Sequence, residues 1–402
     1  MSVSRQDVEQ ARETIRSSVR QTPVVHSDFL SQAYGCQVYL KLENLQRTGA
    51  FKERGAFNKL MNLSEEDRQK GVIAASAGNH AQGVAYGARK LGMDATIVMP
   101  RTTPLIKVQA TKSYGAEVIL EGESYDDAYM HALKLSEEKD VPFIHPFADP
   151  LVIAGQGTVA MELLEESDME DLDIVICAIG GGGLISGMAA YLKDVRPDIQ
   201  LIGVEAESCP AMKLSVDSGK LIQLESAATL ADGIAVKKVS ELTYEMVHHY
   251  VDDIVTVSEN DIANAVLQLL ENEKILVEGA GAATLAALHR DPCRFKDKKV
   301  VLIMSGGNID VNRLNKIITR GLAVDGRICR LRIRLHDVPG RLSSLSTYFD
   351  NIRVNILEIQ HHRVELELPY GFVDVTVTLE TKGFDHIETI RQDLTEQGYE
   401  IV

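Results

Sequence analysis

The sequence predicts an α/β protein with parallel sheets covered by helices, followed by a smaller C-terminal α+β domain. Up to about residue 315, short apolar runs alternate with helical patterns, and several runs lead directly into a glycine-bearing loop. Repeated strand, glycine loop and helix units are typical of parallel sheets. Beyond residues 320–327 the pattern changes, because Cys329–Leu335 alternates strictly between apolar and charged residues. That alternation indicates a strand with one face in water.

The first part of the chain is expected to open with an amphipathic helix, because Val8, Ala11, Ile15 and Val19 recur at helical spacing. Six apolar runs follow that we expect to form strands. They are Val72–Ala75, Ala95–Met99, Glu117–Leu120, Ile174–Ala178, Leu201–Val204 and Val300–Met304.

The last part of the chain predicts the order β-α-β-β-α-β of a ferredoxin-like unit. After the strand at 329–335 we expect four further elements and a last strand ending at Val402: a helix around Leu342–Phe349, strands over Asn355–Arg363 and Phe372–Glu380, and a helix over Asp385–Glu396. The predicted division is a first domain over 1–320 with a small lobe at roughly 50–150, a linker over 321–327 and a second domain over 328–402.

Composition excludes several classes of protein. The 402 residues include 58 Asp and Glu against 42 Lys and Arg, for a net charge of −16, which argues against a general nucleic-acid or anionic-membrane partner. The five cysteines form no CxxC pair, so neither a disulfide framework nor a cysteine-ligated metal site is expected, and we predict no metal. A reduced, cytoplasmic setting fits this pattern, and the charged N-terminus is no signal peptide.

The segment Ile174–Leu192 has 19 residues without a charge, nearly the length of a membrane span. Four consecutive glycines interrupt it, each costing a helix about 1 kcal/mol relative to alanine. We therefore expect a buried strand, a glycine loop and a helix, and no membrane span.

The glycine loop Gly180, Gly181, Gly182 and Gly183, followed by Leu184, has the properties of an anion site. Free backbone amides at a helix start and the helix dipole both favour a phosphate. The alternative is a tight strand–helix turn without a ligand. The dinucleotide fingerprint does not fit, because Ile185 or Ser186 stands where it needs glycine, and no P-loop occurs. Another phosphorylated cofactor is indicated.

Lys52 stands between Phe51 and the start of a predicted helix. A lone lysine there is most simply a solvated helix residue. The helix dipole at an N-terminus, however, opposes the ammonium form and lowers the pKa of the amine, which suits a Schiff-base lysine. Asn79 likewise opens a helix after a strand, where the ordinary interpretation is a helix cap.

Four segments, GAFKERGA, SAGNHAQG, GGGGL and SGGN, occur in this order. In order and spacing they resemble the fold-type-II pyridoxal-phosphate enzymes, a two-lobed family. Within it the chain resembles the threonine dehydratases (threonine ammonia-lyases) that carry one C-terminal ACT-type regulatory domain. The catalytic resemblance covers roughly residues 5–320 and the regulatory resemblance about 326–402.

The resemblance implies pyridoxal 5'-phosphate as cofactor and assigns roles to residues of this sequence. Lys52 is the lysine that bonds to the cofactor and is the catalytic base. The cofactor is further held by Phe51 beside the ring, Asn79 at its 3-oxygen, Gly180, Gly181, Gly182, Gly183 and Leu184 at the phosphate, Ser305 at the ring nitrogen, and Glu278 nearby. The substrate carboxylate is expected on the segment Ser76, Ala77, Gly78, Asn79 and His80. Ordinary interpretations stay open for Ser305, a helix cap, and Glu278, a helix-terminal carboxylate.

The implied reaction is elimination and deamination of L-threonine to 2-oxobutanoate and ammonia, with L-serine as a secondary substrate, in isoleucine biosynthesis or threonine catabolism. A hydroxyl at Ser305 cannot keep the ring nitrogen protonated as a carboxylate would, so transamination is disfavoured. Ala77 stands where racemases of this fold carry a serine base, and His80 stands where cysteine synthases carry threonine. Racemisation and β-replacement are therefore disfavoured.

Three other functions remain as alternatives: a serine dehydratase or racemase, a non-catalytic amino-acid sensor, and a Rossmann dehydrogenase. Glu205 follows a strand where relatives bind a cation, but a structural role is favoured because no ligand set surrounds it.

The ACT-type resemblance implies a small-molecule effector, either a branched-chain amino acid such as isoleucine or valine, or a nucleotide. The effector site is expected at the turn Asp337–Arg341 and the strand start at 355–357 of a homo-oligomer, a dimer or tetramer. Arg330, Arg332 and Arg334 mark either an anion site or a solvated strand face.

Overall fold

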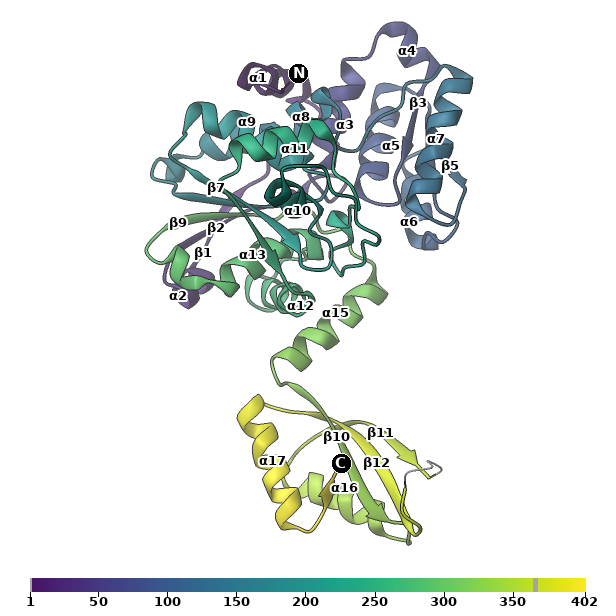
Figure 1. Ribbon diagram of the computed structural model, residues 1–402, viewed down its shortest axis with the longest axis vertical. Helices are drawn as coiled ribbons and strands as arrows, with labels where there is room; N and C mark the ends of the chain where they lie inside the picture. Colours follow the sequence, from purple (N-terminus) through teal and green to yellow (C-terminus); the bar gives the residue numbers. More distant parts are fainter. Residues whose placement is uncertain (1, 364–367) are drawn as a thin grey trace. The chain divides into compact units, whose positions relative to one another are not determined.

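We describe the protein from a computed structural model, in which the described residues are 2–363 and 368–402 (Figure 1). The chain divides into two compact units, Met1–Arg313 and Leu314–Val402. Each unit is described by itself.

The first unit is built on a six-stranded sheet with the strand order β1-β2-β9-β6-β7-β8. All its neighbouring strands are parallel except β1 and β2, which pair antiparallel. The strands are β1 (Val24–Ser27), β2 (Gln37–Lys41), β6 (Ile174–Ala178), β7 (Gln200–Ala206), β8 (Asp253–Val257) and β9 (Lys299–Ile303).

Helices cover both faces of this sheet, with α8 and α9 on one side and α12 and α13 on the other (Figure 1). Every residue of the central strands β6 and β9 is buried, as expected for a parallel sheet between two helical layers. The helices of this larger lobe are α1 (Arg5–Ile15), α2 (Asp28–Tyr34), α8 (Pro150–Leu164), α9 (Gly183–Val195), α10 (Ala211–Ser218), α11 (Glu241–Tyr250), α12 (Glu259–Gln268), α13 (Gly279–Arg290) and α14 (Pro292–Phe295). Short 3-10 helices are η1 (Glu43–Leu45), η2 (Ser167–Met169) and η3 (Asp232–Ile234), and η4 (Leu269–Glu273) is a π-helix.

A second, three-stranded parallel sheet in the order β3-β4-β5 forms a smaller lobe of the same unit. Its core is separate from that of the large sheet and lies between the strands and the helices α3 and α5. The strands are β3 (Val72–Ala75), β4 (Ala95–Met99) and β5 (Glu117–Leu120), and the helices are α3 (Lys52–Met61), α4 (Glu65–Lys70), α5 (Asn79–Leu91), α6 (Leu105–Ser113) and α7 (Tyr125–Lys139).

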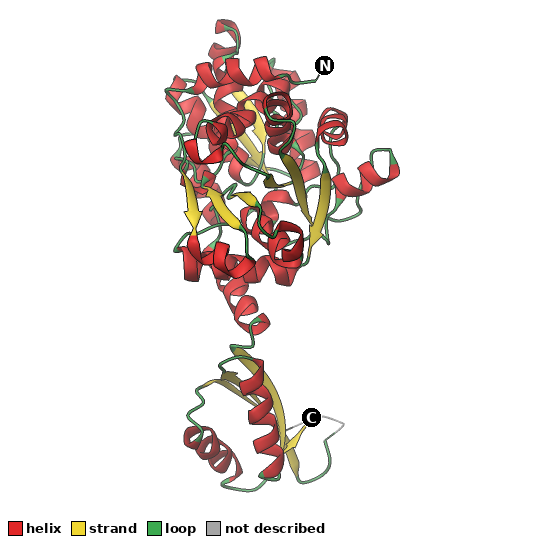
Figure 2. Cartoon of the chain, turned by 90° about the vertical axis from the view of Figure 1, so that its left-hand side faces the viewer, coloured by secondary structure: helices red, strands yellow, loops and turns green. Residues whose placement is uncertain are grey.

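The second unit is a four-stranded antiparallel sheet in the order β11-β12-β10-β13, with two helices on one face (Figure 2). Alternate residues of β10, including Leu331 and Ile333, pack against Leu345 and Leu394 of the helices. The elements are β10 (Ile328–His336), α16 (Arg341–Asn351), β11 (Ile356–His362), β12 (Phe372–Glu380), α17 (Phe384–Glu396) and β13 (Glu400–Ile401).

The predicted α/β class is confirmed, and the six predicted strands coincide with β3, β4, β5, β6, β7 and β9 to within two residues. Sequence patterns did not predict β1, β2 and β8, and the large sheet is not wholly parallel because β1 joins it as a hairpin with β2. Part of the predicted linker 321–327 is helical, since α15 spans Val311–Val324. Within residues 2–363 and 368–402, none of the helices has both the length and the apolar character that crossing a bilayer requires.

Candidate active site

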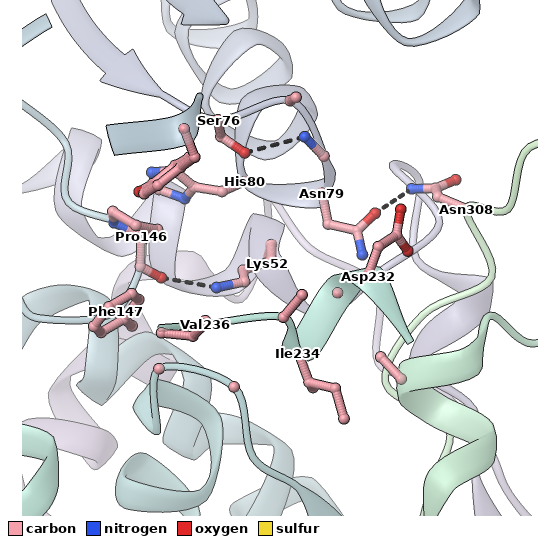
Figure 3. Close-up of a pocket in the computed structure, with 18 of the residues that line it drawn as sticks. Lys52, Ser76, Asn79, His80, Pro146, Phe147, Asp232, Ile234, Val236 and Asn308 are labelled. Carbon is pink, nitrogen blue, oxygen red and sulfur yellow. Dashed lines mark hydrogen bonds between the residues drawn. The ribbon is translucent and has the colours of Figure 1, made fainter. Parts of the chain in front are cut away.

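A cavity of about 790 Å³ opens between the two sheets of the first unit. It is lined by the strand ends and helix starts of both lobes (Figure 3). All of the site residues predicted from the sequence line it, namely Phe51, Lys52, Ser76, Ala77, Gly78, Asn79, His80, Gly180, Gly181, Gly182, Gly183, Leu184, Glu278 and Ser305.

Lys52 is the first residue of α3, and its Nζ donates a hydrogen bond to the carbonyl oxygen of Pro146 at 2.8 Å (Figure 3). Burial lowers the pKa of this amine to about 8, although the nearby Glu278 carboxylate acts in the opposite direction. A sizeable fraction of the amine is therefore neutral near physiological pH. A neutral amine can act as a nucleophile or a base.

The helix that carries Lys52 is held in place by buried ion pairs beneath the cavity. Arg54 contacts Glu43 through Nε and Glu162 through Nη2, both at 2.7 Å, with all three side chains fully buried. Lys41 adds a contact of 2.8 Å to Glu162. Because Arg54 is two residues from Lys52, this network fixes the start of α3.

The glycine loop joins β6 to α9 and faces the cavity. Gly182 has a φ of +88°, a conformation that favours glycine, and α9 begins at Gly183. A Cβ on Gly181 would lie 2.3 Å from the ring of Phe147. The loop therefore needs glycines, and it presents free amides at the start of a 13-residue helix. This arrangement fits a phosphate group.

Asn79 and Glu278 meet on the opposite side of the cavity. The amide Nδ2 of Asn79 donates to Oε1 of Glu278 at 2.7 Å. Burial, reinforced by the charge of Asp232, raises the pKa of Glu278 to about 8. Neither residue caps a helix with its side chain, since Gly78 is the N-cap of α5 and the Glu278 side chain makes no cap bond to α13. The helix-cap interpretation of Asn79 is therefore wrong, whereas Glu278 does stand at the N-terminus of α13, so its interpretation as a helix-terminal carboxylate stays open. Both side chains line the cavity.

Ser305 is the second residue after β9, and the next helix begins only at Val311. It therefore caps no helix, which removes the ordinary interpretation of this residue. Ser305 is almost fully buried and lines the cavity.

The segment after β3 lies at the cavity wall. The hydroxyl of Ser76 accepts a hydrogen bond from the backbone N–H of Gly78 at 3.1 Å. Nε2 of His80 contacts the carbonyl oxygen of Ile144 at 2.8 Å, and burial, with the charge of Lys52, lowers the pKa of His80 to about 3. His80 is therefore neutral, and its ring ties α5 to the segment between α7 and α8 that contains Ile144.

Several lining residues were not predicted from the sequence: Lys107, Pro146, Phe147, Asp232, Ile234, Val236 and Asn308. Asn308 belongs to the SGGN segment, so this motif could have predicted it as a site residue. Asp232 lies in the 3-10 helix η3, where no sequence pattern indicated a site. Asp232 is reached by Lys107 of α6, with 2.8 Å between Nζ and Oδ2.

Glu205 lies outside the cavity lining, near the end of β7. Its carboxylate accepts backbone hydrogen bonds from Met212 at 2.9 Å and Lys213 at 2.7 Å, at the start of α10. Burial raises the pKa of Glu205 to about 7. In the part of the chain that the structure describes, no group of three or more His, Cys, Asp or Glu side chains is placed to hold a metal.

A two-lobed α/β fold, a lysine of lowered pKa and a glycine cradle in one cavity define a phosphate-cofactor enzyme whose lysine can bond to a carbonyl group. A family model described as "Pyridoxal-phosphate dependent enzyme" matches residues 15–306. The chain belongs to this family, and its cofactor is pyridoxal phosphate.

Two curated relatives cover nearly the whole chain. An L-threonine ammonia-lyase of Thermotoga maritima is 46% identical over 399 residues, 99% of each chain, and one of Geobacter sulfurreducens is 45% identical over 392 residues, 98% of this chain and 97% of the relative. Among solved structures, tomato (Solanum lycopersicum) threonine deaminase isoform 2 superposes with a TM-score of 0.74 at 37% identity, covering 79% of this chain and 94% of that one. Maize serine racemase has a TM-score of 0.75 at 35% identity, with 80% and 99% covered.

Proposed function

We propose that the protein is a pyridoxal-phosphate-dependent L-threonine ammonia-lyase, which converts L-threonine to 2-oxobutanoate and ammonia and accepts L-serine as a secondary substrate. The observation that carries this proposal is the placement of Lys52, Asn79, the glycine loop and Ser305 around one cavity. The two relatives that share nearly the full length are named L-threonine ammonia-lyases.

The residues present fit the cofactor. The glycine loop and Leu184 would hold the phosphate through backbone amides, Lys52 would bond to its aldehyde carbon, and Phe51, Asn79 and Ser305 would hold the ring. When bound, pyridoxal phosphate supplies an electron sink for loss of the substrate's Cα proton.

Residues of this chain bind the substrate and transfer its protons. The Ser76–His80 segment binds the substrate carboxylate through backbone amides at the start of α5. The Lys52 amine takes the proton from Cα, a role that its lowered pKa of about 8 supports. Glu278, with a raised pKa near 8, holds a proton close to Asn79.

Racemisation is the nearest alternative, because one similar structure is a serine racemase. A racemase needs a second base on the opposite face of Cα. Ala77 lines the cavity and offers only a methyl group, so elimination is favoured. A non-catalytic sensor is disfavoured because Lys52 and the glycine loop are both intact. A Rossmann dehydrogenase is disfavoured because the chain belongs to the pyridoxal-phosphate-dependent family.

The test uses the purified full-length protein. We expect visible absorbance from bound cofactor and 2-oxo acid release from L-threonine faster than from L-serine, with little D-serine by chiral chromatography. Conversion of L-serine chiefly to D-serine would support the racemase instead. A protein that binds the cofactor but releases no 2-oxo acid from either amino acid would contradict the proposal.

We further propose that residues 328–402 form an ACT-type regulatory domain of a homo-oligomer, a dimer or tetramer. The order of its elements supports this, and the relatives match along the same length. Arg332 and Arg334 both contact the buried carboxylate of Asp374, at 2.8 and 3.0 Å, which favours a structural role for these arginines over an anion site. We propose the effector site at 337–341 and 355–357, with a branched-chain amino acid as ligand.

Calorimetric titration of the full chain with isoleucine, valine and AMP tests this proposal, with light scattering for the subunit count. Binding of a branched-chain amino acid that changes the threonine kinetics supports it. Binding of the nucleotide alone would reassign the effector, and no effect of any ligand would contradict it. A cytoplasmic location is proposed as well, because all five cysteines, each within the described residues, are free thiols.

A further inference from the structure

Asn308 links three segments of the cavity wall through its side-chain amide (Figure 3). Its Nδ2 donates to Oδ1 of Asn79 at 2.9 Å and also to the backbone carbonyl oxygen of Thr48. A side-chain NH2 group has two hydrogens, so both are used.

These bonds determine which way the Asn79 amide points. The carbonyl of Thr48 can only accept, so the NH2 group of Asn308 must face it. The same NH2 group then faces Oδ1 of Asn79, which leaves Nδ2 of Asn79 to donate to Glu278. A flipped Asn79 would set two NH2 groups against each other, at the cost of a buried donor without an acceptor.

Glu278 alone could not impose this orientation. Its pKa of about 8 means that the carboxyl is largely protonated at neutral pH, and a carboxyl group that carries a proton can donate as well as accept. Either orientation of the Asn79 amide would then satisfy Glu278. The backbone carbonyl of Thr48, in contrast, can only accept a hydrogen bond. It therefore fixes the orientation of Asn308, and Asn308 fixes that of Asn79.

Asn308 is itself held closely by the segment that precedes Lys52. The N–H of Gly307 donates to the carbonyl oxygen of Gly49 at 2.8 Å, and Gly49 has a φ of +74°. A Cβ on Gly49 would lie 2.4 Å from Oδ1 of Asn308, so glycine is required for the side chain to fit.

We infer that Asn308 is a positioning residue that orients the amide of Asn79, so that its NH2 group and not its oxygen faces the cofactor side of the cavity. This inference rests on the proposed role of Asn79 as a contact of the cofactor ring. It adds a residue that acts through Asn79 and decides what the Asn79 amide can bind.

The experiment compares cofactor binding by three apo-protein variants, Asn308→Asp, Asn308→Ala and the control Asn312→Asp on an exposed residue of α15. The apparent Kd for pyridoxal phosphate is measured by visible absorbance without substrate, from about pH 5 to about pH 9. We expect the Kd of Asn308→Asp to rise about tenfold at neutral pH, the cost of one unmet buried hydrogen bond. As the pH falls the introduced carboxyl becomes protonated, donates one of the two hydrogen bonds again and restores part of the binding.

Asn308→Ala should bind about tenfold more weakly without any such recovery at low pH, and Asn312→Asp should match the wild type. Thermal unfolding of each apo-protein checks that it is folded. If the aspartate variant is unfolded, the affinity of the alanine variant alone tests the inference. Wild-type affinity in a folded Asn308→Ala would overturn the inference, as would an Asn308→Asp whose affinity has the same pH dependence as the alanine variant. Because no substrate is present, a failure to deaminate threonine is a separate result that bears only on the proposed function.

Discussion

Lys107 and Asp232 form an ion pair, 2.8 Å between Nζ and Oδ2, that joins α6 of the small lobe to η3 at the rim of the cavity. The same Oδ2 atom lies 2.7 Å from Nη1 of Arg313, in the first turn of α15. A second pair of opposite polarity, Asp126 of α7 with Lys237 at 3.6 Å, also connects the small lobe to the segment after η3. The two lobes are thus joined by charges at the opening of the cavity.

Lys107→Ala should weaken the contact between the two lobes at the rim of the cavity. Because the pair is partly exposed, its loss is worth at most about 1 kcal/mol, which corresponds to a rise in KM for threonine of up to about fivefold with a smaller change in kcat. Steady-state kinetics measure this, with Lys134→Ala on the exposed face of α7 as control. A KM unchanged in Lys107→Ala, or raised equally in both variants, would contradict a role for the pair.

Lys52→Ala should abolish the visible absorbance of the bound cofactor and reduce threonine deamination by at least about 10³-fold, since it removes both the covalent bond and the base. Lys59→Ala, on the same helix and paired with Asp149 at 2.7 Å, is the matched control and should keep both. Activity that survives in Lys52→Ala would assign the base to another residue.

Glu278 should make the apo-protein less stable as the pH rises. Its pKa in the folded protein, about 8, is above its ordinary value of 4.5, so between these pH values the folded state binds more protons than the unfolded state. The free energy of unfolding then falls with rising pH across that window. Glu278→Gln keeps the oxygen that accepts from Asn79 but cannot ionise, so it should lack this component.

Urea unfolding of wild type and Glu278→Gln at a series of pH values measures the effect. The stability of the variant relative to wild type should increase from about pH 4.5 to about pH 8. A constant difference would show that Glu278 ionises over the same pH range in the folded and the unfolded protein, so that its pKa is not raised on folding.

Arg54→Met should destabilise the protein by about 3 to 5 kcal/mol, because it leaves Glu43 and Glu162 as buried carboxylates with fewer partners. Arg47→Met is the control, since Arg47 is exposed, and it should change stability by no more than about 0.5 kcal/mol. Denaturant titration of the apo-protein gives both values. A loss of less than 1 kcal/mol in Arg54→Met, on the scale of an exposed pair, would mean that the network is not needed to hold α3.

Much of the fold could be predicted because its elements have strong local patterns. The strands β3 to β6 are short apolar runs between polar turns, and β10 alternates strictly. The strands β1 and β2 were missed because exposed and buried residues are mixed in both. β1 is the edge strand and pairs with β2, which in turn pairs with β9, more than 250 residues away in the chain.

By itself the sequence predicted fourteen residues that line the cavity, because the motifs that contain them are short segments with fixed local geometry. Tertiary structure alone decided how those segments act on one another. The pKa values of Lys52 and Glu278 depend on burial between two lobes, and Asn308 gains its function from Thr48 and Asn79, which are distant in the chain. Desolvation and hydrogen-bond polarity are properties of the assembled cavity, and no local pattern encodes them.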